Sequence, residues 1–245
     1  MELLCIDVGR GTQDILLARP GTLLENSPQL VLPSRAEVVR GLLRERVLRR
    51  ESVLLKGRTM GGFPLPQELG AYLTNGARLF ATWEAARSLS DKPEKVRSLG
   101  VTVVDEGEAA RLERRGLPAI ETFDVDLPGL LKALESLGVR CRPRGVAIAV
   151  QDHGVPPRGG SERKFRFENY RQRLKARPEL AGQSFLGDEV PPTFTRMKSL
   201  LSYLQEWGEA EHFLIMDTGF AKLLGGLEDK RVGGARCKLL LNVGN

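Results

Sequence analysis

The chain is poor in the residues that define several common protein classes. Its 245 residues include three cysteines and two histidines, and aromatic residues make up 6% of the sequence. Cys5, Cys141 and Cys237 are far apart and form no CxxC pair, which predicts reduced thiols in a cytoplasmic protein. No apolar run approaches the roughly 20 residues of a membrane span, and no basic region precedes an apolar signal stretch. We therefore expect a soluble, cytoplasmic protein without a membrane partner.

The start of the chain matches neither GxxxxGK[ST] nor GxGxxG, but it places glycines in a similar setting. Residues 3–17 contain an apolar strand, an aspartate, two glycines and a threonine, and then a second apolar strand. Gly9 and Gly11 can adopt positive φ and carry no Cβ, so backbone amides can converge on a phosphate while Thr12 adds a hydroxyl. Asp7, at the strand end, is expected to hold Mg²⁺ through water. The alternative is a tight turn whose glycines only satisfy turn geometry.

The net charge of +6 comes from one segment of the chain. Residues 158–177 contain eight Lys or Arg and two Glu, so the remainder is formally neutral. Phe165, Phe167 and Tyr170 lie among these charges, a composition that suits nucleic-acid binding through charge and stacking. The more ordinary interpretation is a solvated helix or a surface insertion.

Strands and helices alternate along the chain. Apolar runs bounded by turn residues predict strands at 2–8, 13–18, 29–32, 52–56, 78–82, 101–104, 119–123, 145–151, 212–216 and 237–243. Helices are predicted after Ser34, whose capping box is completed by Glu37, from Asp126 to Gly138, and at 193–207. Segment 155–192, rich in Pro, Gly and charge, is predicted to be an insertion or loop. The pattern predicts an α/β fold, a mixed sheet with helices on both faces.

Polar residues near the predicted strand ends are the candidates for chemistry. Asp152 and His153 follow the strand at 145–151, where a carboxylate beside an imidazole suits a general base. Adjacent residues point to opposite sides of a strand, so at most one of the two should face a cleft. Asp14 lies in the second strand, where it either faces the cleft and positions water or is solvated.

Four segments, in this order, resemble the actin, Hsp70 and sugar-kinase ATPase superfamily, in which two ribonuclease-H-like lobes clamp a nucleotide. Residues 4–17 resemble its first phosphate hairpin, and residues 146–154 resemble a later strand of the first lobe. Residues 217–227 resemble the small-residue helix that crosses between lobes, and residues 238–245 resemble the start of the second phosphate hairpin. The resemblance implies a ribonuclease-H-like lobe over 1–236, with an insertion at 155–192 and a truncated second lobe beginning at 237–245.

Shorter motifs, among them Gln151-Asp152-His153-Gly154 and Asn242-Val243-Gly244-Asn245, resemble an uncharacterised prokaryotic family. Its members are often labelled pyruvate formate-lyase activating enzyme-like. A radical-SAM activase needs three closely spaced cysteines to hold an iron–sulfur cluster, and this chain does not have them. The label therefore does not predict the function.

The superfamily resemblance implies Mg²⁺-dependent ATP binding, with hydrolysis or transfer of the γ-phosphate to an unknown protein or small-molecule acceptor. Asp7 would hold the metal, and Asp152 and Asp14 would act as catalytic carboxylates. The residues implied in nucleotide binding are Gly9, Arg10, Gly11, Thr12, Gln13, Asp217, Gly219, Asn242, Gly244 and Asn245. Asp217 has a second interpretation, as the cap of the helix after it. Asn242 replaces the aspartate that is usual in the second hairpin.

The alternative function belongs to a different class: a catalytically silent scaffold, or a nucleic-acid-binding module that uses residues 158–177. Mg²⁺-dependent ATP binding favours the first interpretation, and steeply salt-dependent RNA binding favours the second. Under the first, we expect residues 158–177 to play no part in ATP chemistry. We also expect the 245-residue chain to bind ATP weakly and without turnover, because donors from both lobes are needed to hold the γ-phosphate.

Overall fold

The structure is a computed structural model of the chain, and it describes residues 1–61, 69, 70, 74, 76–156, 160–229 and 231. The chain divides into two compact units. The first unit comprises Met1–Val8, Asp14–Val31 and Ala133–Asn245, and the second comprises Gly9–Gln13 and Leu32–Lys132. The strand and the second lobe that the sequence predicts within 237–245 lie outside the described residues.

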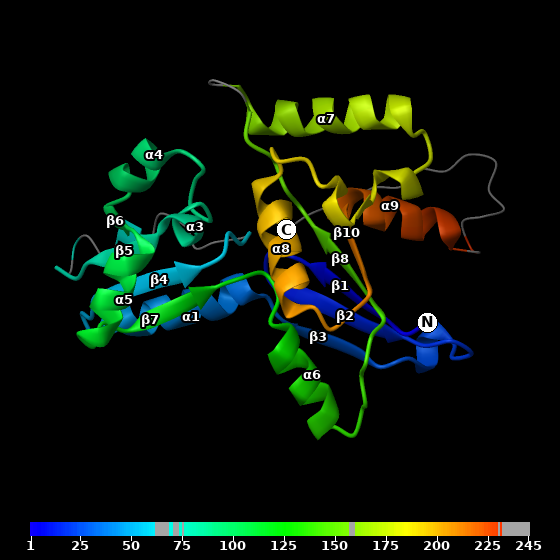
Figure 1. Cartoon of the computed structure of the whole chain (residues 1–245), viewed down its shortest axis with the longest axis horizontal. Coiled ribbons are helices and arrows are strands. Elements are labelled where there is room, and N and C mark those ends of the chain that lie inside the picture. Colours follow the sequence, from blue (N-terminus) through cyan, green and yellow to red (C-terminus); the bar gives the residue numbers. More distant parts are fainter. Residues whose placement is uncertain (62–68, 71–73, 75, 157–159, 230, 232–245) are drawn as a thin grey trace. The chain divides into compact units, whose positions relative to one another are not determined.

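The first unit is built on a six-stranded mixed sheet (Figure 1). Its strands, in spatial order, are β3 (Gln29–Pro33), β2 (Thr12–Ala18), β1 (Leu3–Val8), β8 (Gly145–Val150), β10 (His212–Asp217) and β9 (Phe185–Leu186). Strand β8 runs parallel to β1 and to β10, and β9 is antiparallel to β10. In this register Ala149 of β8 is flanked by Asp7 of β1 and Met216 of β10. The carboxyl ends of three strands therefore meet at one edge of the sheet.

The two faces of this sheet differ. On β1, Leu4, Ile6 and Val8 are buried, whereas Cys5 and Asp7 point to the opposite face and are partly exposed. The long helices of the unit are α7 (Glu162–Ala176), α8 (Thr195–Trp207) and α9 (Thr218–Glu228), and short 3₁₀ turns occur at Leu24–Asn26, Ala181–Gln183 and Gly187–Glu189. Helices α8 and α9 both contact β10. One face of β1 thus belongs to the core, and the other is partly exposed.

The second unit contains a four-stranded parallel sheet. Its strands, in spatial order, are β6 (Val101–Val104), β5 (Leu79–Thr82), β4 (Val53–Gly57) and β7 (Ala119–Thr122). Its helices are α1 (Arg35–Leu48), α3 (Trp83–Ala86), α4 (Pro93–Ser98) and α5 (Glu106–Arg114), and α6 (Leu127–Ser136) begins in this unit and ends in the first. Consecutive residues of β4, Val53, Leu54 and Leu55, are all fully buried, as expected for a parallel strand covered on both faces.

The mixed α/β class and the strands predicted from 2–8 to 212–216 are confirmed, with ends shifted by one residue at most. The predicted caps are present as well: Ser34 accepts a hydrogen bond from the Glu37 amide, and Asp126 accepts one from the Gly129 amide. Gly138, with φ of 80°, follows the end of α6 in the left-handed conformation that suits glycine. These elements were predictable because their signals are local.

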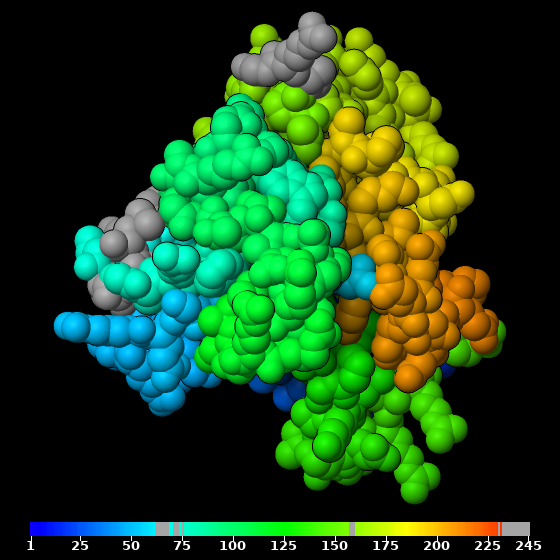
Figure 2. Space-filling view, turned by 60° about the vertical axis from the view of Figure 1, so that its left-hand side comes forward, coloured from blue at the N-terminus to red at the C-terminus, as the bar shows by residue number. Residues whose placement is uncertain are grey.

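Segment 155–192, predicted as an insertion or loop, contains α7, two 3₁₀ turns and β9. Helix α7 begins after Ser161, whose hydroxyl caps the Lys164 amide. Its outer side is exposed, and Figure 2 shows this part of the chain, in yellow-green, at the surface. Its inner side is not solvated, because Tyr170 is buried against Phe194 and Phe220. Within the described residues, no helix is long and apolar enough to cross a membrane.

Candidate functional site

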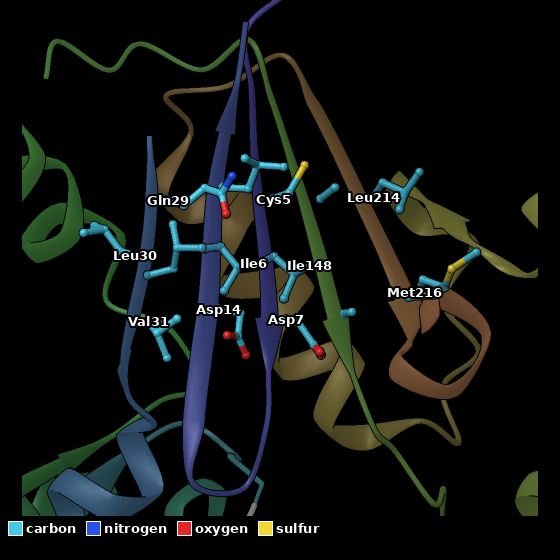
Figure 3. A pocket seen from close by; sticks show the side chains of 15 residues that line it. Cys5, Ile6, Asp7, Asp14, Gln29, Leu30, Val31, Ile148, Leu214 and Met216 are labelled. Atoms are coloured by element: carbon cyan, nitrogen blue, oxygen red, sulfur yellow. The ribbon is translucent and has the colours of Figure 1, made fainter. Parts of the chain in front are cut away.

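The accessible face of the first unit's sheet contains a pocket of about 370 Å³ (Figure 3). Residues of β1, β2, β3, β8 and β10, together with Ala221 of α9, line it. On β8, Ala147 and Ala149 contribute only methyl groups to this lining. The charged residues of the lining are Asp7 and Asp14, which lie beside each other on the neighbouring strands β1 and β2 (Figure 3).

Asp7 is held by the first turns of α9. The Thr218 hydroxyl donates to Asp7 Oδ1 at 3.2 Å, and Lys222 Nζ lies 3.9 Å from Asp7 Oδ2. Burial raises the pKa of the Asp7 carboxyl above its ordinary value, and Asp14 adds to this rise. Lys222 and the Thr218 hydroxyl act in the opposite direction and lower the pKa. Asp7 is therefore a partly desolvated carboxylate whose negative charge is only partly balanced by its protein partners.

Asp14 lines the same pocket as Asp7. Its side chain is exposed, whereas those of its neighbours Gln13 and Ile15 are buried. Two carboxylates on adjacent strands repel each other, and they favour a cation between them. The arrangement suits a divalent cation, which prefers carboxylate and hydroxyl oxygens as ligands.

The turn between β1 and β2 differs from the expectation. Neither Gly9 nor Gly11 has a positive φ, so the turn does not use that conformational freedom. Gly9 is required for another reason: its amide donates to the Thr12 carbonyl at 2.9 Å, and a Cβ on Gly9 would lie 2.8 Å from that oxygen. The amides of Arg10 and Gly11 have no acceptor among the described residues, and both residues are exposed. These two amides remain candidates for an anion.

The carbonyl side of the same turn is anchored within the second unit. The Ser34 hydroxyl donates to the Arg10 carbonyl at 2.6 Å, and the Ser34 amide donates to the Gly11 carbonyl at 2.9 Å. Gln13, predicted as a nucleotide ligand, is buried, and its side-chain amide donates to the Pro33 carbonyl at 3.2 Å. Ser34 thus caps α1 and also fixes the turn, whereas Gln13 has a structural partner.

Asp152 is placed as a helix cap. Its Oδ1 accepts the Gly154 amide at 2.8 Å and its Oδ2 accepts the Met197 amide at 3.0 Å, in the first turn of α8. Its side chain is buried, while His153 is exposed, so the two point to opposite sides as predicted. Phe194, the residue before α8, provides no side-chain cap, and Asp152 supplies the missing acceptor. The geometry favours a structural role for Asp152 over the predicted role of base.

Asp217 caps α9, in agreement with one of its two interpretations. It accepts the Gly219 amide at 2.9 Å, and its side chain is 1% exposed. Arg166 of α7 pairs with it through two nitrogens, Nε at 2.9 Å and Nη2 at 2.6 Å. Both Asp217 and Gly219 are therefore engaged in the start of α9. The remaining predicted nucleotide ligands, Asn242, Gly244 and Asn245, lie outside the described residues.

Thr218 and Lys222 are site residues that sequence reasoning missed. They follow a predicted strand end, and their four-residue spacing places both on one side of a helix. That spacing can be recognised in the sequence, but it does not identify Asp7 as their partner. The spatial order of β1, β8 and β10 depends on long-range pairing and cannot be inferred from local sequence. In the described part of the chain, no cluster of three or more His, Cys, Asp or Glu side chains is arranged to hold a metal.

Comparison with known proteins gives a family but no characterised relative. No curated protein matches the chain. A protein-family model described as "Putative pyruvate format-lyase activating enzyme (DUF1786)" matches residues 60–245. This match includes Asp152, Asp217, Thr218 and Lys222, and it begins after β1 and β2. Because it covers well over half of the sequence, the chain belongs to the DUF1786 family.

Proposed function

We propose that this protein binds ATP with Mg²⁺ and hydrolyses the γ-phosphate or transfers it to an acceptor, as a member of the actin-like ATPase superfamily. The observation that carries the proposal is that Asp7 and Asp14 line one pocket, while Thr218 and Lys222 both contact Asp7. The initial hairpin followed by parallel strands supports a ribonuclease-H-like lobe. The proposal concerns residues of the first unit.

The donor set suits Mg²⁺. Asp7 and Asp14 supply carboxylate oxygens and Thr218 a hydroxyl oxygen, which are hard ligands of the kind that Mg²⁺ takes beside water and phosphate. A bound Mg²⁺ would neutralise phosphate charge and orient the phosphates for attack. The raised pKa of Asp7 is consistent with a carboxylate that lacks a full counter-charge in the absence of a cation.

Lys222 provides the protein's own positive charge at this site. Its side chain is half exposed, and its 3.9 Å separation from Asp7 is at the long limit of an ion pair. Such a lysine can turn from the carboxylate to a phosphate at little cost, because exposed ion pairs contribute only about 0–1 kcal/mol. We therefore assign Lys222 to the phosphate.

Asp14 is the carboxylate that we assign to the attacking water. It is exposed on the pocket face, whereas both oxygens of Asp152 accept backbone amides. The family description names an activating enzyme, but Cys5, Cys141 and Cys237 do not have the spacing of a radical-SAM cluster.

Calorimetric titration tests the proposal. We expect the chain to bind ATP with Mg²⁺ and to lose this affinity when EDTA is added. Asp7→Asn and Asp14→Asn should each weaken Mg²⁺-dependent binding by at least about tenfold, or about 1.4 kcal/mol. Glu25→Gln, which removes an exposed acid from the first unit, is the matched control and should leave it unchanged. Equal affinity in Asp7→Asn and the wild type would remove Asp7 from the site.

A further inference from the structure

Helix α7 is joined to the start of α9 by a buried ion pair. The Arg166 side chain is 14% exposed and that of Asp217 is 1% exposed. Two guanidinium nitrogens reach the two carboxylate oxygens, a planar two-point contact that fixes orientation as well as distance. Ion pairs of this kind are a weak source of stability compared with apolar packing, but they specify geometry strongly. The relevant property of this ion pair is therefore the geometry that it fixes.

The ion pair positions Thr218 and Lys222, the two residues that contact Asp7. Asp217 also caps the Gly219 amide, so the guanidinium, the carboxylate and the first turn of α9 form one connected unit. Thr218 follows Asp217 directly, and Lys222 lies one helical turn later. Both contact Asp7. A rotation of the start of α9 would therefore change both contacts at once.

A second contact between the same two helices lies one turn along α7. The Tyr170 ring is 4.8 Å from the Phe220 ring, centroid to centroid, and 5.6 Å from that of Phe194. Tyr170 is 4% exposed, so this contact is part of the core. Arg166 and Tyr170, four residues apart, therefore hold the first turn of α9 with one polar and one aromatic contact.

We infer that Arg166 is a positioning residue of the Asp7 site: through Asp217 it sets the start of α9, and with it Thr218 and Lys222. This inference rests on the proposed function and extends it to α7. It replaces the expectation that residues 158–177 have no part in ATP chemistry. Among the basic residues of this segment, Arg166 differs from Arg163, Lys164 and Arg171, whose side chains are exposed.

The test is a set of α7 variants titrated with Mg²⁺ and ATP. Arg166→Met combined with Asp217→Asn removes the ion pair without leaving a buried charge, and the asparagine can still accept the Gly219 amide. We expect this double variant to weaken binding about tenfold and Arg166→Lys, with Asp217 retained, to restore part of it. Arg171→Gln, an exposed arginine on the same helix, is the control and should bind as the wild type does.

A double-mutant cycle separates positioning from general destabilisation. In a Lys222→Met background, loss of the Arg166–Asp217 pair should cost less than about twofold further, because the group that it positions is already gone. Additive losses would overturn the inference, since they would mean that the ion pair acts independently of Lys222. A double variant that binds as tightly as the wild type would overturn it as well.

Hydrogen exchange by mass spectrometry gives a readout that does not need nucleotide. Loss of the ion pair should speed exchange in peptides from residues 217–224, while peptides from β8 keep their protection. If the wild type binds no ATP but this local effect appears, the proposed function fails and the coupling of α7 to α9 stands. If the wild type binds ATP but residues 217–224 of the double variant exchange as they do in the wild type, the inference fails and the proposed function stands.

Discussion

The two sheets of this protein use the ends of their strands differently. In the second unit, polar residues near strand ends are paired internally: the Thr122 hydroxyl donates to the Lys56 and Arg58 carbonyls, and Asp124 accepts the Gly61 amide. In the first unit, Asp7 at the end of β1 has one hydroxyl at 3.2 Å and one ammonium at 3.9 Å. The first arrangement closes a loop, whereas the second leaves a carboxylate available to a ligand.

The difference follows from how the sheets are covered. Strand β4 is buried on both faces, so any polar group at its end must find a protein partner. Strand β1 is buried on one face only, and its other face carries Cys5 and Asp7 into a pocket. A polar group can remain incompletely paired where solvent or a ligand reaches it. Open sheet faces are therefore where a binding site is expected in this chain.

The largest effect should come from the covered sheet. Leu54→Ala removes a fully buried side chain from the centre of β4 and should lower the free energy of unfolding by about 2–5 kcal/mol. Urea denaturation followed by circular dichroism measures this change. A loss below about 1 kcal/mol would mean that the second unit repacks easily, which would contradict the description of β4 as a closely packed central strand.

Asp152→Ala should have the next largest effect. It removes the acceptor of the Gly154 and Met197 amides, both in buried surroundings, and should cost about 1–3 kcal/mol of stability. Asp152→Asn, which keeps one acceptor oxygen, should cost less. If Asp152 acted as the base instead, both variants would abolish turnover in an active enzyme while leaving thermal stability near that of the wild type.

Asp7→Asn should stabilise the fold at neutral pH. Burial raises the pKa of Asp7, so its ionised form is disfavoured in the folded state. The protonated Asp7 carboxyl contributes stability that is fully present below the unfolded-state pKa and is lost as the pH rises through the folded-state pKa. The variant should therefore gain up to about 1 kcal/mol at pH 7. Thermal melts should show this gain shrinking as the pH falls toward about 4, and a pH-independent difference would contradict this origin.

The smallest effect is expected on the open face itself. Val31 of β3 lines the pocket and is 67% exposed, so Val31→Ala should change the free energy of unfolding by less than about 0.5 kcal/mol. The same urea denaturation used for Leu54→Ala provides the comparison. A cost similar to that of Leu54→Ala would mean that this face is packed against other groups and is not open.

Much of the fold was predictable because its signals are local. The apolar run of β8 and the alternation of β1 identify strands, and Ser34 and Asp126 mark helix starts through their own side chains. Helix α7 was harder to recognise. Its sequence shows mainly charges, and nothing local indicates that Arg166 is buried through an ion pair with Asp217, 51 residues away.

The candidate site was predictable in part for the same reason. Asp7 and Asp14 belong to one hairpin, so sequence places them near each other. Thr218 and Lys222 reach Asp7 only because β8 lies between β1 and β10 in the sheet, an order that depends on long-range pairing. The capping contact of Asp152 could not be predicted from local sequence, because its partner, the amide of Met197, is 45 residues along the chain.

The central claim is that Asp7 and Asp14 hold a divalent cation, and paramagnetic broadening tests it most directly. Mn²⁺ replaces Mg²⁺ and broadens the methyl signals of nearby residues in an NMR spectrum. We predict selective broadening at Ala147 and Ala149, which line the pocket with the two carboxylates, and at Thr218, which contacts Asp7, with no selective broadening in Asp7→Asn. Uniform broadening, or broadening that persists in Asp7→Asn, would contradict the claim.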